Sequence, residues 1–150
     1  MKSDNCSICS WINEIKINPN YLIKELSTGY VVLSKYQYKY YRGYTVFICK
    51  RHVGELHELE NDFKLSFLKE MSQAAEAVFK AFNPDKLNYE MLGNTEPHLH
   101  WHLFPRYKSD PNFKRPIWVV DKQIRQADST IASLEEIKQL KNRINTFLDK

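Results

Sequence analysis

The chain has 150 residues and lacks any apolar run of about 18 residues, the length that a membrane-spanning helix needs. Glycine is scarce, with four residues, and neither a flexible linker nor an internal repeat divides the chain. The segment from Met1 to Cys6 contains no apolar stretch resembling a secretion signal, so we expect a cytoplasmic protein. These absences argue against a membrane protein and predict a single domain over residues 1–150.

Cysteine and net charge are also limited. The three cysteines, Cys6, Cys9 and Cys49, make an odd number, which argues against a disulfide framework in a reducing compartment. With 22 basic and 18 acidic residues the formal net charge is +4, which suits an anionic substrate. This excess is too small to indicate nucleic-acid binding, so we expect no specific nucleic-acid partner.

Hydrophobic periodicity predicts an α+β domain with a mainly antiparallel sheet, because short strands precede and follow a long amphipathic helix. The helix is predicted around 63–82, where apolar residues recur at three- and four-residue steps. Ser133 and Glu136 form a capping-box pattern that predicts the start of a C-terminal helix. The predicted strands lie at 21–26, 30–34, 44–49, 86–92 and 98–104, and a short helix or turn is expected at 11–17.

The most informative segment runs from Pro97 to Pro105 and reads Pro-His-Leu-His-Trp-His-Leu-Phe-Pro. On a strand, His98, His100 and His102 would share one face, and the intervening apolar residues would share the other. We expect the two prolines to bracket this strand, since proline is tolerated mainly at strand ends and edges. Solvated surface histidines are the alternative. Imidazoles, however, bind metals and attack phosphorus or acyl centres, so this face is a candidate catalytic site.

Cys6 and Cys9 form a Cys-x-x-Cys pair, a spacing that lets two thiolates reach one tetrahedral Zn²⁺. The residues that could complete such a site are Cys49, His52, His57 and the three strand histidines. A redox-active pair and a pair of inert thiols are the alternatives.

The histidine segment and the Cys-x-x-Cys pair together resemble a known family. The segment His98–Phe104 matches the His-φ-His-φ-His-φ-φ signature (φ, apolar) of the histidine triad (HIT) superfamily. Pro105-Arg106-Tyr107, Lys50-Arg51-His52-Val53 and the Cys-x-x-Cys of its zinc-bearing branch are similar as well. The resemblance runs from about residue 6 to residue 107 and is loose over 108–150, which we expect to form a loop and a C-terminal helix.

The resemblance implies a HIT-like α+β fold, with about five mainly antiparallel strands, one long central helix and a C-terminal helix. It also implies a homodimer and an enzyme that acts on nucleotides. His100 would be the nucleophile that attacks a nucleoside α-phosphate, and His102 would donate to a phosphate oxygen or the leaving group. Asn94 and Thr95 would contact phosphate, although a plain strand-connecting turn also fits these two residues.

Zinc-bearing relatives imply the ligand set Cys6, Cys9, His52 and His98, which would hold one structural zinc ion per chain. A further divalent cation could accompany the substrate. The expected activity is hydrolysis of dinucleoside polyphosphates or nucleoside phosphoramidates through a nucleotidyl-histidine intermediate. A nucleotidyl transferase, and a nucleotide- or zinc-binding interaction module with little catalysis, are the alternatives.

The chain departs from the family pattern at two positions. Tyr44 stands where many relatives carry a histidine, and Ser34 stands where many carry an acidic ribose contact.

Several other residues are expected to be structural. We expect Trp101, Phe104 and Trp118 in the core or a dimer interface, Cys49 in the core, His57 on the surface, and Arg106 and Lys108 as solvated loop charges.

Overall fold

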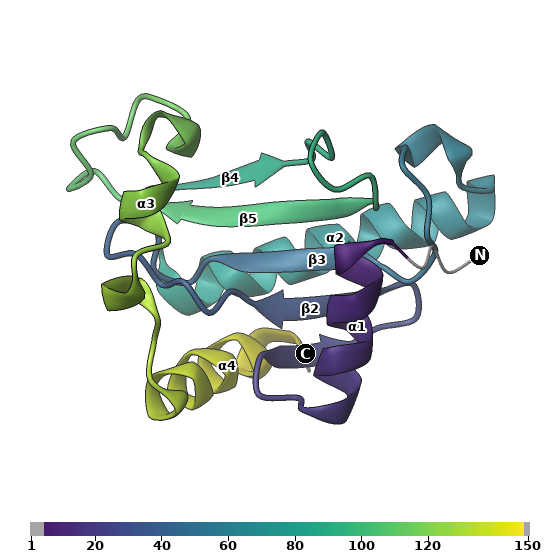
Figure 1. Ribbon diagram of the computed structural model, residues 1–150, viewed down its shortest axis with the longest axis horizontal. Coiled ribbons are helices and arrows are strands. Elements are labelled where there is room, and N and C mark those ends of the chain that lie inside the picture. Colours follow the sequence, from purple (N-terminus) through teal and green to yellow (C-terminus); the bar gives the residue numbers. More distant parts are fainter. Residues whose placement is uncertain (1–4, 149–150) are drawn as a thin grey trace.

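A five-stranded antiparallel sheet forms the centre of the computed structural model, which describes residues 5–148 (Figure 1). The strand order is β1-β2-β3-β5-β4, and every neighbouring pair is antiparallel. The predicted α+β class with an antiparallel sheet of five strands is therefore confirmed. Residues 1–4, part of the segment used to predict the absence of a secretion signal, lie outside the described residues. The strands are β1 (Leu22–Glu25), β2 (Gly29–Leu33), β3 (Thr45–Cys49), β4 (Lys86–Glu90) and β5 (His100–Arg106).

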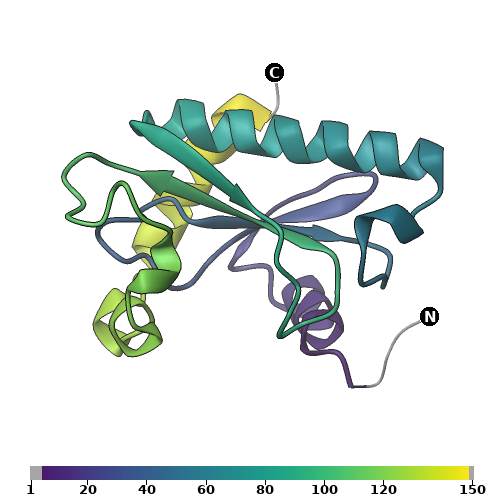
Figure 2. The same ribbon diagram turned by 90° about the horizontal axis from the view of Figure 1, so that it is seen from above.

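Helices cover both faces of the sheet (Figure 2). Helices α2 (Asn61–Phe82) and α4 (Leu134–Leu148) pack against each other, and α2 also contacts β5, β3 and β2. Helix α1 (Ser7–Ile17) and the short helix α3 (Lys122–Arg125) lie on the opposite side of the sheet from α2 (Figure 2). All residues of β2 and β3 are buried, which explains why these strands read as nearly continuous apolar runs.

Each face of the sheet contributes to its own hydrophobic cluster. On the α2 side, Val31 and Phe47 pack with Phe67 of the helix, whose ring stacks on that of Phe47 with centroids 5.0 Å apart. On the α1 side, the helix residues Ile8, Ile12 and Ile15 pack against Tyr30, Val32, Val46 and Ile48. This alternation determines which side chains of β5 face α2 and which face α1 and α3.

Local signals set the ends of the helices. Helix α2 ends where Asn83 adopts a left-handed conformation, with φ 45°, and Pro84 follows. The predicted capping box of α4 is confirmed, because the Glu136 carboxylate accepts from the Ser133 amide and the Ser133 hydroxyl accepts from the Glu136 amide. Gly43, just before β3, has φ +98°, and a Cβ there would lie 2.5 Å from the Phe82 ring, so only glycine fits.

Strand β5 does not have the predicted ends. It runs from His100 to Arg106 and therefore contains Pro105, which we expected to terminate it, whereas His98 precedes it. The pairing explains the error. The ladder to β3 ends at the Leu103–Thr45 pair, and Pro105 pairs only with Leu87 of β4. Beyond Leu103 the side of β5 that faced β3 has no paired strand, so a residue without a backbone N–H is tolerated there.

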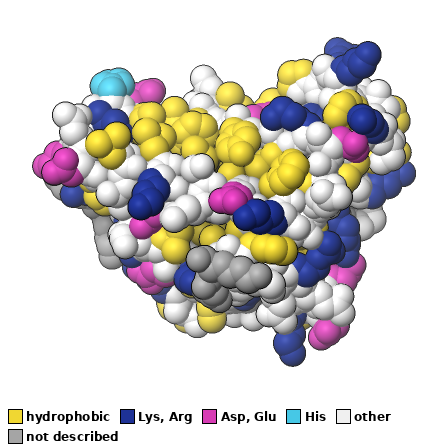
Figure 3. Space-filling model, turned by 180° about the vertical axis from the view of Figure 1, so that it is seen from behind, with side chains coloured by type: hydrophobic (Ala, Val, Ile, Leu, Met, Phe, Trp, Pro, Cys, Tyr) yellow, Lys and Arg dark blue, Asp and Glu magenta, His cyan; other side chains and the backbone are white. Residues whose placement is uncertain are grey.

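The face formed by α2 and α4 is partly apolar at its surface. Figure 3 shows a band of hydrophobic side chains across this face, and the exposed apolar residues of α2 include Leu65 and Phe79. None of the helices described within residues 5–148 is long and apolar enough to cross a membrane.

Candidate functional site

The three alternating histidines belong to two neighbouring sites rather than one. His100 and His102 line a cavity on the side of the sheet where α3 lies. His98 lies just before the start of β5, next to Cys6, Cys9 and His52. Trp101 and Leu103 belong to the core on the α2 side, as the alternation predicts.

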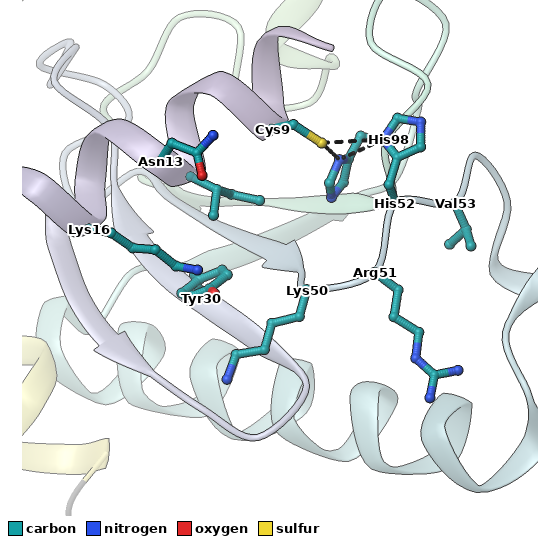
Figure 4. Close-up of a pocket in the computed structure, with 10 residues that line it drawn as sticks. Cys9, Asn13, Lys16, Tyr30, Lys50, Arg51, His52, Val53 and His98 are labelled. Carbon is teal, nitrogen blue, oxygen red and sulfur yellow. Dashed lines mark hydrogen bonds between the residues drawn. The ribbon is translucent and has the colours of Figure 1, made fainter. Parts of the chain in front are cut away.

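The Cys/His cluster joins three separate parts of the chain (Figure 4). Cys6 is the N-cap residue of α1, and its sulfur accepts from the amide of Cys9, which begins to position both thiols. His52 follows β3, and His98 precedes β5. The four candidate ligand atoms lie within 4.8 Å of one another, and Cys6 and His98 are buried.

The spacing of these atoms fits one tetrahedral metal ion. Zinc bonds of 2.0–2.3 Å give edges of about 3.3 Å between two nitrogens and about 3.6 Å between nitrogen and sulfur. The Nδ1 atoms of His52 and His98 are 3.3 Å apart. The Sγ atom of Cys9 lies 3.4 Å from Nδ1 of His52 and 3.5 Å from Nδ1 of His98, and Sγ of Cys6 lies 3.6 Å from the latter. The cluster could therefore bind a metal.

The orientation of His98 supports the same conclusion. Its Nε2 donates to the carbonyl oxygen of Cys49 over 2.8 Å, so in the neutral ring Nδ1 carries the lone pair and points at both thiols. Burial, with smaller contributions from His52 and His100, lowers the pKa of His98 and favours this neutral form. A neutral histidine with its second nitrogen hydrogen-bonded is the usual form of a metal ligand.

A cavity of about 380 Å³ lies beside the cluster. The triad residues His100 and His102 line it, together with Asn94 and Thr95 of the loop before β5, which the sequence predicted as phosphate contacts. The remaining lining residues are Tyr44, Leu92, Gly93, Glu96, Trp118, Lys122, Arg125 and Gln126.

Hydrogen bonds orient the two histidines of the cavity. Nδ1 of His100 donates to the carbonyl oxygen of His98, which leaves the lone pair of the neutral ring on Nε2. That Nε2 lies 3.1 Å from Nε2 of His102. Nδ1 of His102 in turn lies 2.7 Å from the hydroxyl of Tyr44.

Burial shapes the ionisation of this group. It lowers the pKa of His102 to about 3, with smaller contributions from His100 and Arg125, so His102 is neutral at physiological pH. Burial also raises the pKa of Tyr44, which keeps its phenol protonated. The cavity therefore contains a neutral imidazole and an un-ionised phenol beside His100.

The sequence predictions missed the wall formed by residues 118–126. Trp118, expected in the core or an interface, is 38% exposed and meets His102 edge to face, with centroids 5.7 Å apart. Its indole N–H donates to Glu90, and the Arg125 guanidinium lies 4.7 Å from its ring centroid. The only sequence signal was a short apolar run, Ile117–Val120, followed by basic residues in an otherwise polar segment.

Arg106 also differs from the prediction. Instead of being a solvated loop charge it is 1% exposed and pairs with the buried carboxylate of Asp110 at 2.9 Å. Its two terminal nitrogens also donate to the Asn88 side chain and to the carbonyls of Asn112 and Arg115, which ties the segment after β5 to the sheet. Lys108 is exposed, as predicted.

The remaining predicted residues lie outside the two sites. Cys49 is buried in the core and His57 is exposed, both as predicted. Trp101 and Phe104 are core residues, also as predicted. Ser34 is buried, and its hydroxyl accepts from the amide of Tyr36.

Comparison with known proteins gives matches of three kinds: a curated relative, solved structures and a family model. A curated relative, an uncharacterised HIT-like protein from Methanocaldococcus jannaschii, is 27% identical over 73 residues. That alignment covers 46% of this chain and 57% of the relative, so the match spans little more than half of that protein.

Solved structures share the fold over most of the chain. A histidine triad protein from Bradyrhizobium japonicum has a TM-score of 0.72 at 21% identity, covering 89% of this chain and 94% of its own. A Zn-bound histidine triad family protein from Mycobacterium smegmatis has a TM-score of 0.65 at 20% identity, with 97% and 96% covered. The diadenosine triphosphate hydrolase of Plasmodium falciparum, in complex with cyclomarin A, has a TM-score of 0.59 at 14% identity, with 88% and 78% covered.

The family model described as the HIT domain matches residues 28–109, more than half of the chain. This range contains the three triad histidines, the loop before β5 and His52. The protein therefore belongs to the HIT domain family.

Proposed function

We propose that this protein is a nucleotide hydrolase that attacks a nucleoside α-phosphate through His100. One observation carries the proposal: the Nδ1–H of His100 is bound to the His98 carbonyl, which directs the Nε2 lone pair into the cavity shared with His102. A neutral imidazole held in one tautomer is a good nucleophile at neutral pH.

The proposed reaction has two steps. In the first, the Nε2 lone pair of His100 forms a bond to the α-phosphorus, and the bond from phosphorus to the leaving group breaks with its electron pair on the leaving atom. A polyphosphate leaves as the anion, whereas an amine takes a proton from solvent as it leaves. The carbonyl of His98 stabilises the resulting cationic ring through the Nδ1–H. In the second step, water attacks the same phosphorus and loses a proton to solvent, and the bond from phosphorus to Nε2 breaks with its electron pair on Nε2. This releases a nucleoside monophosphate and restores the neutral imidazole.

The walls of the cavity suit an anionic substrate. Lys122 and Arg125 bring positive charge, and Asn94 and Thr95 bring uncharged donors, to the same space as the two histidines. Burial raises the pKa of Glu90 and lowers that of His102, and the positive charge of Arg125 partly offsets the first shift and adds to the second. The proposed substrates are dinucleoside polyphosphates or nucleoside phosphoramidates, and the similarity to a diadenosine triphosphate hydrolase supports the first class. A divalent cation accompanying the polyphosphate belongs to the same proposal.

We further propose that Cys6, Cys9, His52 and His98 hold one structural zinc ion. The four ligand positions fit a tetrahedral site, and a structurally similar protein is Zn-bound. Bound there, the metal would cross-link α1 to the start of β5 and would leave the reaction to His100. Such a link keeps the His98 carbonyl in place, and this carbonyl orients the nucleophile.

The assembly and location of the protein are also part of the proposal. We propose that residues 1–150 act as one domain, that the domain forms a homodimer and that the protein is cytoplasmic. Strand β4 is an edge strand of the sheet, and its outer side pairs with no other strand within residues 5–148. Such an edge can extend the sheet into a second copy. Sedimentation equilibrium would report the mass of the assembly directly.

Substitution of His100 by Asn tests the activity. The variant should release nucleoside monophosphate from diadenosine tetraphosphate and from an adenosine phosphoramidate at least about 10³-fold more slowly than the wild type. The matched control is His57→Asn, because His57 is exposed and outside the cavity. Undiminished turnover by the His100 variant would contradict the assigned nucleophile.

Two further measurements separate the alternatives. Product analysis with added sugar phosphate distinguishes hydrolysis from nucleotidyl transfer, since a transferase would yield a new nucleotide sugar. An interaction module would bind the nucleotide and release no product in either assay.

A further inference from the structure

Tyr44 occupies a distinctive position in the cavity, at the turn that leads into β3. Its hydroxyl lies 2.7 Å from Nδ1 of His102, on the side of the ring opposite His100. The ring stacks on Phe104, with centroids 4.0 Å apart and an interplanar angle of 17°. Gly43, the residue before it, requires a backbone conformation that favours glycine. The phenol is therefore held by the fold at one edge of His102.

The donors and acceptors in the hydrogen bonds that link His100, His102 and Tyr44 can be assigned by starting from the His98 carbonyl, which can only accept. The carbonyl oxygen of His98 must accept, so Nδ1 of His100 carries the hydrogen, and a neutral His100 has its lone pair on Nε2. The 3.1 Å contact between the two Nε2 atoms then needs its hydrogen on His102. A neutral His102 with Nε2–H has its lone pair on Nδ1, so the Tyr44 hydroxyl donates to it.

The reverse direction is incompatible with attack. If His102 carried its hydrogen on Nδ1 and donated to Tyr44, its Nε2 would be an acceptor. The hydrogen between the two rings would then have to come from His100, which would carry hydrogens on both nitrogens and have no lone pair. Only the first arrangement leaves His100 nucleophilic.

We propose that Tyr44 is a positioning residue that holds His102 as the Nε2–H tautomer by donating its hydroxyl hydrogen to Nδ1. This inference rests on the proposed function and identifies what prepares His102 for it. When the Nε2 lone pair of His100 bonds to phosphorus, the Nε2–H of His102 is released to donate a hydrogen bond to a phosphoryl or leaving-group oxygen. His102 donates without losing its proton, so neither its charge nor that of Tyr44 changes.

The surroundings of the pair favour this arrangement. Burial disfavours a charged form of His102 and of Tyr44, so a hydrogen-bonded neutral pair is the stable state. A buried Nδ1 without a donor would cost about 1–3 kcal/mol, which is enough to shift the population toward the other tautomer. A single hydroxyl group is therefore sufficient to decide which nitrogen of His102 faces the nucleophile.

The variant Tyr44→Phe tests the proposal, because it removes the hydroxyl and keeps the ring that stacks on Phe104. Long-range proton–nitrogen NMR correlations of the ¹⁵N-labelled protein report which nitrogen of His102 is protonated, and a His102→Gln sample identifies its signals. We expect the Nε2–H tautomer alone in the wild type and a mixture in the variant. We also expect kcat to fall about 10–100-fold with little change in KM.

The matched control is Tyr41→Phe. Tyr41 packs on Phe104 as well, here edge to face with centroids 5.8 Å apart, and its buried hydroxyl has no hydrogen-bond partner among the described residues. Removal of this hydroxyl should change neither the His102 tautomer nor kcat. A loss of activity common to both variants would show a packing effect and overturn the assignment.

Other outcomes are equally decisive. An Nδ1–H tautomer in the wild type, or a Tyr44→Phe protein with unchanged tautomer or unchanged kcat, would overturn the proposal. If the wild type turned over neither diadenosine tetraphosphate nor adenosine phosphoramidate, the proposed function would fail. The NMR result would still support or overturn the tautomer assignment, because it needs no substrate.

Discussion

The Nε2–H of His98 donates a hydrogen bond to the carbonyl oxygen of Cys49, over 2.8 Å, at the point where β3 ends and the approach to β5 begins. Because one ring nitrogen is committed to this bond, the other is free to face Cys6 and Cys9. The carbonyl of His98 at the same time accepts from His100. One residue thus connects the candidate metal cluster to the candidate nucleophile.

The proposed zinc site predicts that loss of one of its cysteines releases the metal. Cys9→Ser should lower the metal content from one ion per chain, measured by plasma mass spectrometry on gently purified protein. If zinc is present at about a thousand times its dissociation constant, its loss removes about 4 kcal/mol from the free energy of unfolding. Chemical denaturation would measure that difference.

Cys49→Ala is the matched control for this experiment. The Cys49 side chain is buried in the core. Its contact with His98 is made by the backbone carbonyl, which the substitution keeps, so the variant should retain its metal. It should lose about 1 kcal/mol of stability through the cavity it creates. Wild-type protein with intact cysteines and no more than traces of metal would contradict the ligand set.

Our proposed function predicts that positive charge on α3 determines how well the protein binds a polyphosphate substrate. A hydrogen bond to a charged group contributes about 1.5–3 kcal/mol, so Arg125→Ala should raise KM for diadenosine tetraphosphate about 10-fold or more. The increase in KM for an adenosine phosphoramidate should be smaller, because its leaving group is a neutral amine that carries no phosphates. Steady-state kinetics with both substrates would measure the difference.

Two exposed lysines separate the effect of charge inside the cavity from the effect of the protein's overall charge. Lys122 lines the cavity, whereas Lys138 lies on α4 and does not line it. We expect Lys122→Ala to change the preference between the two substrates in the same direction as Arg125→Ala, and Lys138→Ala to leave it unchanged. Equal effects of the two lysine variants would indicate only a general attraction of anions.

The buried Arg106–Asp110 pair should contribute strongly to stability when only one member is removed. Arg106→Met leaves the carboxylate of Asp110 buried without its cation, which costs about 3–5 kcal/mol. The exposed pair of Lys108 and Asp85, 3.5 Å apart, is the comparison, since Lys108→Met should cost at most about 1 kcal/mol. Urea denaturation of both variants would show whether burial produces the difference.

His102 should make the folded state less stable in acid. The unfolded chain binds a proton at this histidine below about pH 6.5, whereas the folded protein resists protonation until about pH 3. The unfolded state therefore holds more protons in this window, and stability falls as the pH decreases, by up to about 1.4 kcal/mol per pH unit. The free energy of unfolding of His102→Gln should fall less steeply between about pH 7 and about pH 4. Identical slopes would argue against a neutral, buried His102.

The sequence was sufficient for the features that depend on local patterns. The period of α2, the capping box at Ser133 and the alternation around Trp101 each reflect neighbouring residues, and the structure confirms all three. The prediction that His52 shares a metal site with Cys6 and Cys9 came from the family resemblance and not from hydrophobic periodicity. The structure places the four predicted ligands within one cluster.

The errors concern features that depend on tertiary contacts. Pro105 continues β5 because β3 has already ended, which no local pattern reveals. Arg106 is buried because Asp110 and three oxygen acceptors surround it, although its sequence neighbours are polar. Trp118 and Arg125 reach the cavity only because the segment after β5 returns across the sheet. The contact between Tyr44 and His102 likewise joins residues 58 positions apart.

Identification of the residue that carries the nucleotidyl group tests the central claim most directly. Wild-type protein would be mixed briefly with diadenosine tetraphosphate, quenched, digested and examined by tandem mass spectrometry. Our proposal predicts one adenylyl group on His100, and none in the His100→Asn protein. Turnover without an adduct at any histidine, or with the adduct on His98 or His102, would contradict it.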